Sequence, residues 1–279
     1  MRLGVNVPNF GPGTDPGMLR SWAQTVEGLG FDLLMVSDHV VVTPDVAEQY
    51  PAPFYEPFTT LSWLAGITRE IRLGTTVLIA PYRHPLLVAR MVANLNQLSD
   101  ERLVLGVGVG WARQEFEALG VPFEQRGQLT DDLLRGLRTA WADDGDYRTG
   151  RIPIWVGGNS GAGLRRAVRF GDAWHPLRSR LGWLRDRLDR LKAVADEEDR
   201  PIPEFAPRIV LRLTETPIAI ADRLAGEGTI EQVVDDLDEL RLLGADTVVL
   251  DPFAGDPAET RHPLAAWHAL AAVTDHWNR

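Results

Sequence analysis

A glycine-rich turn is the first feature of the sequence with recognisable chemistry. The residues Gly157-Gly158-Asn159-Ser160 follow an apolar run and lead directly into the helical stretch GLRRAVRF. Such a turn brings free backbone N–H groups and the positive end of a helix dipole to one point, which suits a phosphate group. A tight strand-to-helix turn without a ligand has the same composition. The spacing is neither a Walker A loop nor GxGxxG, so ATP and a Rossmann-bound nicotinamide are not indicated.

A second pattern is a run of glycines spaced two apart that ends in a tryptophan. Gly106, Gly108 and Gly110 precede Trp111. In a strand these three glycines would share one face, where a flat ring or a second backbone could approach closely. A sheet interior too narrow for side chains would require the same glycines, and both interpretations stay open. Trp111 is the tryptophan best placed to line a ring.

Two histidines also follow apolar runs. His39 comes directly after Asp38, and His175 stands between Trp174 and Pro176. A histidine at such a position can carry a proton or donate a hydrogen bond to a bound ring, and it can equally be a capping or packing residue. Metal binding by Asp38, His39, His175 and Asp251 is a further alternative, although HExxH spacing is absent. A serine nucleophile is not expected, because the chain has no GxSxG motif.

These residues all follow short apolar runs that alternate with helix-period stretches along the whole chain. We predict strands at 3–8, 32–37, 71–79, 102–109, 153–157, 172–176, 208–213 and 246–251. We predict helices at about 15–29, 57–68, 84–98, 129–142, 161–170, 180–197, 229–243 and 262–277. Most strands are continuously apolar, which is typical of parallel strands covered on both faces. The alternation predicts an α/β fold over residues 1–279 as a single domain, a closed (β/α)8 TIM barrel, with a doubly wound sheet as the alternative.

Composition excludes several classes of function. The 279 residues carry 29 Lys and Arg against 39 Asp and Glu, a net charge of −10, without a basic stripe. We therefore expect neither a nucleic-acid partner nor an anionic membrane surface. The absence of cysteine excludes disulfides, thiolate metal sites and cysteine nucleophiles. The N-terminus has no signal-peptide core and no apolar run is long enough to span a membrane, so a cytoplasmic location is expected.

Five segments in this order and spacing resemble the luciferase-like monooxygenase superfamily, whose (β/α)8 enzymes use FMN or the deazaflavin F420. They are GFDLLMVSDHV (30–40), IRLGTTVLIAPYRHPLLVAR (71–90), RLVLGVGVGWARQEFEALGVPFEQRG (102–127), IPIWVGGNSGAGLRRAVRFGDAWHP (152–176) and LRLLGADTVVL (240–250). The resemblance covers essentially the whole chain, and within the superfamily the sequence is most similar to the F420-dependent branch.

The resemblance implies a role for each residue at the predicted carboxyl ends of the strands. Asp38 and His39 would contact the cofactor ring or the substrate. The remaining cofactor contacts would come from Thr75, Thr76, Val77, Gly108, Gly110, Trp111, Gly157, Gly158, Asn159 and Ser160. Among these, Thr76 and Val77 would form a non-prolyl cis peptide behind the ring, and the glycine-rich turn at 157–160 would hold the cofactor phosphate.

Two departures from the family pattern limit what can be carried over. The sugar-phosphate dehydrogenases of the superfamily have a catalytic glutamate where this chain has Trp111, which puts that substrate in doubt. Relatives also have a longer, aromatic-rich connection where residues 143–152 cross directly. We therefore expect a more open pocket, or one that a partner subunit closes.

The sequence thus leads to one leading hypothesis with two alternatives. We expect F420-dependent hydride transfer to or from a small organic substrate, with His39 as the proton donor or ring-polarising group. Asp38 would orient His39, and His175 is the secondary candidate. The close alternative is a monooxygenase that uses O₂ and reduced FMN from a separate reductase. A non-catalytic or regulatory relative is the alternative from another class. Relatives are commonly dimers, so a homodimer is one candidate state of assembly.

Overall fold

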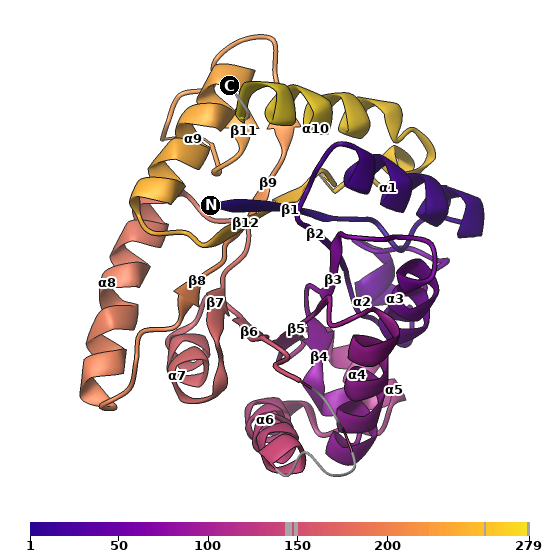
Figure 1. The fold of residues 1–279 in the computed structure, drawn as a ribbon, viewed down its shortest axis with the longest axis vertical. Coiled ribbons are helices and arrows are strands. Elements are labelled where there is room, and N and C mark those ends of the chain that lie inside the picture. The colour runs from indigo at the N-terminus through magenta and orange to yellow at the C-terminus, as the bar shows by residue number, and fades with distance from the viewer. Residues whose placement is uncertain (143–146, 148–149, 222, 254, 278–279) are drawn as a thin grey trace.

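A curled sheet of parallel strands forms the centre of the computed structural model (Figure 1). The structure describes residues 1–142, 147, 150–221, 223–253 and 255–277. The strands of this sheet are β1 (Arg2–Asn6), β2 (Leu33–Val36), β3 (Arg72–Thr75), β4 (Leu78–Ile79), β5 (Leu103–Gly108), β6 (Ile154–Gly157), β7 (Ala173–His175), β8 (Glu204–Phe205), β9 (Arg208–Val210) and β12 (Thr247–Asp251). Their order is β8-β7-β6-β5-β3-β2-β1-β12-β9, and β4 pairs with β5.

The strands form where the sequence is continuously apolar, because both of their faces are covered. Every residue of β2, β5 and β12 is buried. The first and last strands of the chain are neighbours, with Arg2 opposite Thr247. The predicted α/β fold is therefore confirmed. The structure shows its parallel sheet as curled, with the carboxyl ends of all its strands at one end of the molecule.

Helices surround the outer face of the curled sheet (Figure 1). The long ones are α1 (Pro16–Gly28), α3 (Pro57–Ala65), α4 (Pro85–Leu98), α6 (Arg126–Ala142), α7 (Gly161–Phe170), α8 (Leu181–Glu197), α9 (Ile230–Leu242) and α10 (Leu264–Trp277). Each confirms a predicted helix. The start of α9 is a capping box in which Thr229 and Gln232 bond each other's backbone N–H. Gly30 and Gly244 follow the last helical turns with φ of 81° and 88°, a conformation that suits glycine.

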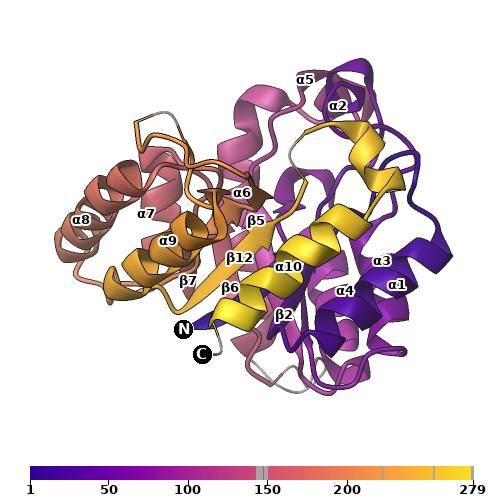
Figure 2. The same ribbon diagram turned by 90° about the horizontal axis from the view of Figure 1, so that it is seen from above.

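The structure departs from the predicted elements where the chain forms the carboxyl-end loops. The predicted strand 71–79 is two strands, β3 and β4, separated by a cis peptide bond between Thr76 and Val77. The predicted strand 208–213 is likewise divided into β9 and β10 (Arg212–Leu213), and β10 pairs with the unpredicted β11 (Glu227–Gly228). Two short helices were also not predicted, α2 (Pro44–Ala47) and α5 (Arg113–Ala118). Figure 2 shows α2 and α5 together at the end of the molecule opposite the chain termini.

The sequence also predicted a short connection at 143–152 and no segment long enough to span a membrane. Most of the connection 143–152, expected to be shorter than in relatives, lies outside the described residues, so its effect on the pocket stays a prediction. Of the helices that the structure describes, none combines the length and the apolar character needed to cross a membrane.

Candidate active site

A cavity of about 490 Å³ opens at the carboxyl ends of the strands, where an α/β fold of this kind is expected to bind its ligand. Most of the predicted site residues line it. They are Asp38, His39, Thr76, Val77, Gly108, Gly110, Trp111, Gly157 and Gly158. Thr75, Asn159, Ser160 and His175 are not part of its wall.

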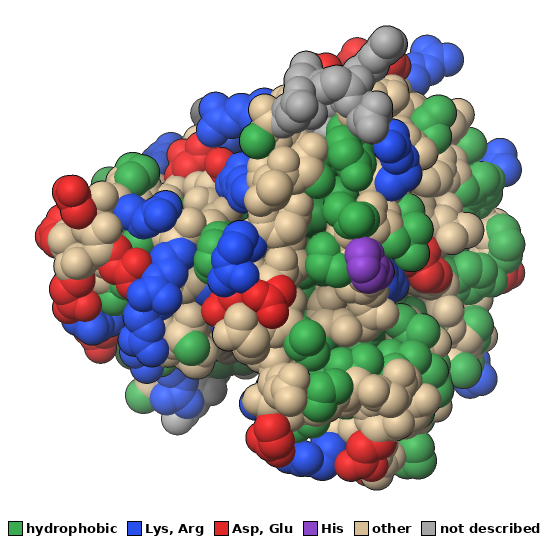
Figure 3. Space-filling view, turned by 90° about the horizontal axis from the view of Figure 1, so that it is seen from below, with side chains coloured by type: hydrophobic (Ala, Val, Ile, Leu, Met, Phe, Trp, Pro, Cys, Tyr) green, Lys and Arg blue, Asp and Glu red, His purple; other side chains and the backbone are tan. Residues whose placement is uncertain are grey.

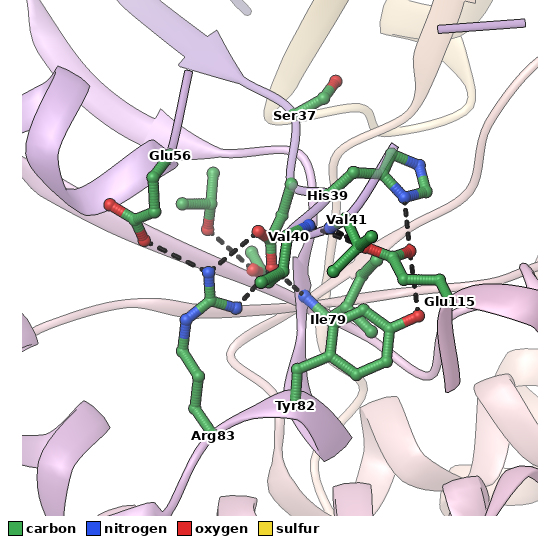
Figure 4. A network of polar contacts seen from close by, with 12 residues as sticks. Ser37, His39, Val40, Val41, Glu56, Ile79, Tyr82, Arg83 and Glu115 are labelled. Atoms are coloured by element: carbon green, nitrogen blue, oxygen red, sulfur yellow. Dashed lines mark hydrogen bonds and ion pairs between the residues drawn. The ribbon is translucent and has the colours of Figure 1, made fainter. Parts of the chain in front are cut away.

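His39 lies in the cavity wall and is held by a buried glutamate. Its Nδ1 atom is 2.7 Å from Oε2 of Glu115, the same oxygen that accepts a 3.0 Å hydrogen bond from the Tyr82 hydroxyl. The other carboxylate oxygen accepts the backbone N–H groups of Val40 and Val41. Figure 4 shows the second ring nitrogen of His39 pointing away from Glu115. No described residue forms a hydrogen bond with that Nε2 atom, which leaves it available to a ligand.

The electrostatics of this group favour an ionised Glu115. Burial opposes the charge, but the hydrogen bond from His39 and those from the two backbone N–H groups outweigh it and hold the pKa of Glu115 below its usual value. Burial and the nearby carboxylate raise the pKa of Tyr82, so its hydroxyl stays protonated and donates. Because Glu115 offers only acceptor atoms, Nδ1 of His39 carries a proton and Nε2 is the atom that can exchange one with the cavity.

Asp38 does not orient His39, which corrects the expectation from the sequence. Its carboxylate accepts two hydrogen bonds from Arg83, of 2.6 and 2.9 Å, and a third from the backbone N–H of Ile79. Burial raises the pKa of Asp38, and the paired guanidinium of Arg83 works against that shift. Arg83 also bonds Glu56 at 3.1 Å. This cluster fixes the loop after β4 against the end of β2, and the orienting role belongs to Glu115.

His175 is also corrected, from a secondary proton carrier to a buried supporting residue. One ring nitrogen bonds the carbonyl of Ala206, and Nε2 is 2.9 Å from the Thr76 hydroxyl. Burial lowers the pKa of His175 to about 4, so the ring is neutral near pH 7. Nδ1 therefore donates to Ala206 and Nε2 accepts from Thr76. With both nitrogens in use, His175 positions Thr76 rather than a substrate.

The glycines of the wall are required by protein neighbours. An added Cβ at Gly106 would lie 2.0 Å from the carbonyl oxygen of Thr75, whose hydroxyl bonds the Gly106 carbonyl. Added Cβ atoms at Gly108 and Gly157 would lie 2.4 and 2.8 Å from methyl groups of Val77. The nearby backbone of Thr75 therefore accounts for Gly106, and the nearby side chain of Val77 accounts for Gly108 and Gly157. Thr75 is thus a link between strands, not a cavity residue.

The glycine-rich turn is shaped as predicted, although its polar side chains face the protein. The Ser160 hydroxyl caps α7 by accepting the Gly163 N–H at 3.1 Å. Asn159 bonds both the N–H and the carbonyl of Leu177. Gly158, with φ of 123°, remains in the cavity wall beside the start of α7. The expected role of the turn in holding a phosphate stays a prediction that rests on its backbone.

An arginine pair that the sequence analysis did not identify completes the wall. Arg208 and Arg178 both line the cavity and both approach the buried carboxylate of Asp251. Burial opposes the charge of Asp251, yet the two guanidinium groups hold its pKa below the usual value. In the sequence, Arg178 and Arg208 stand outside any motif, so no signal distinguished them from the other arginines of the chain. Within the described residues, no group of three or more His, Cys, Asp or Glu is arranged to hold a metal ion.

The sequence of the chain was also compared with known protein families. Residues 1–214 match the model of the luciferase-like monooxygenase family. The chain belongs to this family. An uncharacterized protein of Mycobacterium tuberculosis is 32% identical over 204 residues, which span 61% of this chain and 67% of that protein. A phthiodiolone/phenolphthiodiolone dimycocerosates ketoreductase of the same species is 31% identical over 144 residues, 44% of this chain and 38% of the ketoreductase.

Solved structures of the same fold include enzymes with either cofactor. An F420-dependent secondary alcohol dehydrogenase, in complex with an F420–acetone adduct, superposes with a TM-score of 0.76, 17% identity and 98% coverage of both chains. The oxygenating constituent of 3,6-diketocamphane monooxygenase from Pseudomonas putida, in complex with FMN, superposes with a TM-score of 0.75 at 16% identity, covering 98% of this chain and 97% of the other. At these identities the likeness shows the fold alone.

Proposed function

We propose that this protein is an F420-dependent oxidoreductase that interconverts a hydroxyl and a carbonyl group on a small organic substrate. The observation that carries the proposal is the buried His39–Glu115 pair, which presents one unpartnered ring nitrogen in the wall of the cavity. The names of two similar proteins support the reaction class, one a ketoreductase and one an F420-dependent secondary alcohol dehydrogenase.

The residues of the cavity fit a cofactor of the flavin or deazaflavin class. Such a cofactor needs a broad cavity and hydrogen-bond donors for the carbonyl groups of its ring. Its phosphate needs either backbone N–H groups or cationic side chains. The cavity offers about 490 Å³ and, at Gly157 and Gly158, the backbone beside the start of α7. We propose that Thr76, Val77, Gly108 and Trp111 lie beside the ring and that the turn at 157–160 holds the phosphate.

His39 has the proton-transfer role in this proposal. When bound, the cofactor supplies or accepts the hydride at carbon. In the direction of carbonyl reduction, His39 gives the proton from Nε2 to the substrate oxygen; in the direction of alcohol oxidation, Nε2 takes it back. Glu115 keeps the other nitrogen protonated in both directions, so the ring always presents the same atom to the cavity.

We also propose that the curled sheet closes into the (β/α)8 barrel predicted from the sequence. The segment 204–210 supports closure. Its first half, β8, pairs with β7 through Glu204 and Ala173, and its second half, β9, pairs with β12 through Arg208 and Val249. A barrel closed in this way would bring Arg178 and Arg208 to the same cavity as His39.

An assay of reduced F420 with a panel of ketones, without oxygen, tests the proposal. Wild-type protein should oxidise reduced F420 in the presence of a ketone, and His39→Ala should lower turnover by on the order of 10² to 10⁴ while cofactor affinity is retained. His268→Ala, a change on the exposed side of α10, is the control.

Unchanged turnover in His39→Ala would remove this residue from the mechanism. Oxygen-dependent oxidation of a substrate with reduced FMN, and no reaction with F420, would assign the protein to the two-component monooxygenases instead. Binding of neither cofactor would favour the non-catalytic alternative.

A further inference from the structure

The wall of the cavity across from His39 carries more positive charge than its carboxylate can balance. Arg178 and Arg208 both line this wall, and Asp251 is the carboxylate that both approach. The other carboxylate in the cavity wall, Asp38, is paired with Arg83, and the buried Glu115 behind the wall binds His39. Among the described residues, one guanidinium is therefore left without a full counter-charge.

Arg208 is the arginine whose three side-chain nitrogens all donate hydrogen bonds to the protein. Its Nε and Nη2 atoms bond Oδ2 of Asp251 at 3.1 and 2.6 Å. Its Nη1 atom bonds the Thr76 carbonyl at 2.9 Å and approaches the Thr76 hydroxyl at 3.3 Å. Arg208 is buried, and it fixes the cavity wall between β3 and β12.

Arg178 is the arginine with donors to spare. Its Nη2 atom bonds the carbonyl of Phe253 at 3.1 Å and approaches Asp251 at 3.4 Å. Its Nε and Nη1 atoms form no hydrogen bond with any described residue. The side chain is 27% exposed, so it is neither buried in a structural pair nor free in solvent. Unused N–H groups of a guanidinium in a cavity wall suit a planar, two-oxygen anion.

The backbone of Arg178 supports a functional role. The residue has a φ of 46°, in the left-handed region where a side chain costs free energy relative to glycine. A neighbouring strand holds this conformation, because the Arg178 N–H bonds the Arg208 carbonyl at 3.0 Å. Strained residues of this kind persist where the surrounding structure fixes them, and they cluster at ligand sites.

The position of Arg178 relative to His39 indicates what it would bind. His39 follows β2 and Arg178 follows β7, and these strands are separated in the sheet by β3, β5 and β6. The two residues therefore stand at opposite walls of one cavity. A substrate whose hydroxyl or carbonyl oxygen faces His39 would extend its far end toward Arg178.

We infer that the substrate carries a carboxylate, which Arg178 binds while the reacting group faces His39. The part of this inference that concerns the reacting group rests on the proposed function. The binding of a carboxylate by Arg178 does not require a bound cofactor. The spatial pairing of Arg178 with Arg208 and Asp251, which the sequence does not show, is the basis of this inference.

Calorimetric titration of the cofactor-free protein with benzoate and with its neutral analogue benzamide tests the carboxylate site. Wild-type protein should bind benzoate about tenfold or more tightly than benzamide, as expected for one charge-assisted hydrogen-bond pair. Arg178→Gly, which also suits the left-handed backbone, should bind the two molecules equally. Arg178→Lys should keep part of the preference, because it keeps the charge without the planar fork. Arg180→Gly, which removes an exposed arginine two residues away, should behave as wild type.

Equal affinities for benzoate and benzamide in wild-type protein, or an unchanged preference in Arg178→Gly, would overturn the inference.

A parallel titration with FMN and riboflavin shows whether Arg178 binds the substrate or the cofactor. If Arg178→Gly loses a preference for FMN over riboflavin, Arg178 binds the cofactor phosphate and the substrate assignment is wrong. Because benzoate binding is measured without cofactor, failure of the ketone assay would leave this result intact and would count against the proposed function alone.

Discussion

Glu115 is fully buried and its two oxygens accept hydrogen bonds from His39, Tyr82, Val40 and Val41. These four donors fix both the position and the charge of the carboxylate. A carboxylate held in this way determines which nitrogen of the adjacent histidine is protonated, since it can only accept. The chemistry proposed for His39 therefore depends on a residue that itself has no access to the cavity.

Replacing Glu115 by Gln should slow the reaction in both directions. The amide oxygen would stay at the Val40 and Val41 N–H groups, so the amide nitrogen would face His39 and donate to Nδ1. His39 would then carry its proton on Nε2, where it could not take up another, and it would be left as an imidazolate if it gave that proton away. We expect turnover in both directions to fall by on the order of 10².

The measurement is the rate in each direction as a function of pH. Glu124→Gln, which changes an exposed glutamate, is the matched control. A loss of rate with an unchanged pH profile would mean that Glu115 only supports the fold.

His175 should make stability depend on pH. Its pKa is lowered to about 4 in the folded protein, from an ordinary value of 6.5, because the ring is buried. Between these values the unfolded chain binds a proton that the folded protein does not, so the free energy of unfolding falls as the pH drops from 6.5 to 4. The loss from this group amounts to about 3 kcal/mol.

Urea unfolding across this pH range measures the effect. His175→Gln should reduce the pH dependence, whereas His268→Gln, on the exposed side of α10, should leave it unchanged. The same slope in wild-type protein and His175→Gln would contradict the assignment of a neutral, buried ring.

At this scale the sequence predicted His39 but not its partner. Asp38 is adjacent in the chain, yet neighbours in an extended segment point to opposite sides, and Asp38 binds Arg83 instead. Glu115 lies in the short helix α5, which the sequence did not predict, and it meets His39 across 76 positions. Arg178 and Arg208 were missed for the same reason, because a pairing through Asp251 exists only in space.

The side chain of Val77 packs against two of the strands that end at the cavity, β5 and β6. It stands between β3 and β4 and fills the space in front of Gly108 in β5 and Gly157 in β6. The sequence predicted both strands and the glycines, and left open whether a ligand or the protein required them. Spacing could not decide this. The resemblance to the family did imply a cis peptide between Thr76 and Val77, which the structure confirms, but it did not indicate that the Val77 side chain would lie against these glycines.

Gly108→Ala should destabilise the protein through Val77. The new Cβ would lie 2.4 Å from a Val77 methyl group, and overpacking of this kind costs about 1–3 kcal/mol. The cost should shrink in a Val77→Ala background, because the opposing methyl groups are gone. A double-mutant cycle on unfolding free energies measures this coupling.

Gly182→Ala is the control, since nothing lies within 4 Å of an added Cβ there. It should be neutral or slightly stabilising in α8. Strictly additive costs for Gly108→Ala and Val77→Ala would show that the glycine is required by something other than this contact.

At the scale of the whole molecule, one sheet connects the two ends of the chain. β1 pairs with β12, and the segment 204–210 pairs with β7 on one side and β12 on the other. The sequence predicted this α/β architecture well, because buried parallel strands and capped helices have strong local patterns. On the face drawn in Figure 3, mixed acidic and basic side chains cover the α8 side, and hydrophobic side chains gather on the other side.

A sheet that joins both ends of the chain should unfold as one unit. We expect a single calorimetric transition whose enthalpy equals the van't Hoff value, because neither half can keep its sheet neighbours without the other. Two resolved transitions would contradict a single domain over residues 1–279. Concentration dependence of the midpoint would reveal an assembly such as the homodimer expected from relatives.

The most direct test of the account is a fluorescence titration of the purified protein with F420 and with FMN, each in oxidised and reduced form. The account predicts micromolar binding of F420, weaker binding of FMN, and the same F420 affinity in His39→Ala. Preference for FMN would contradict the proposed hydride transfer from F420, and binding of neither cofactor would contradict the central claim that this cavity is a cofactor site.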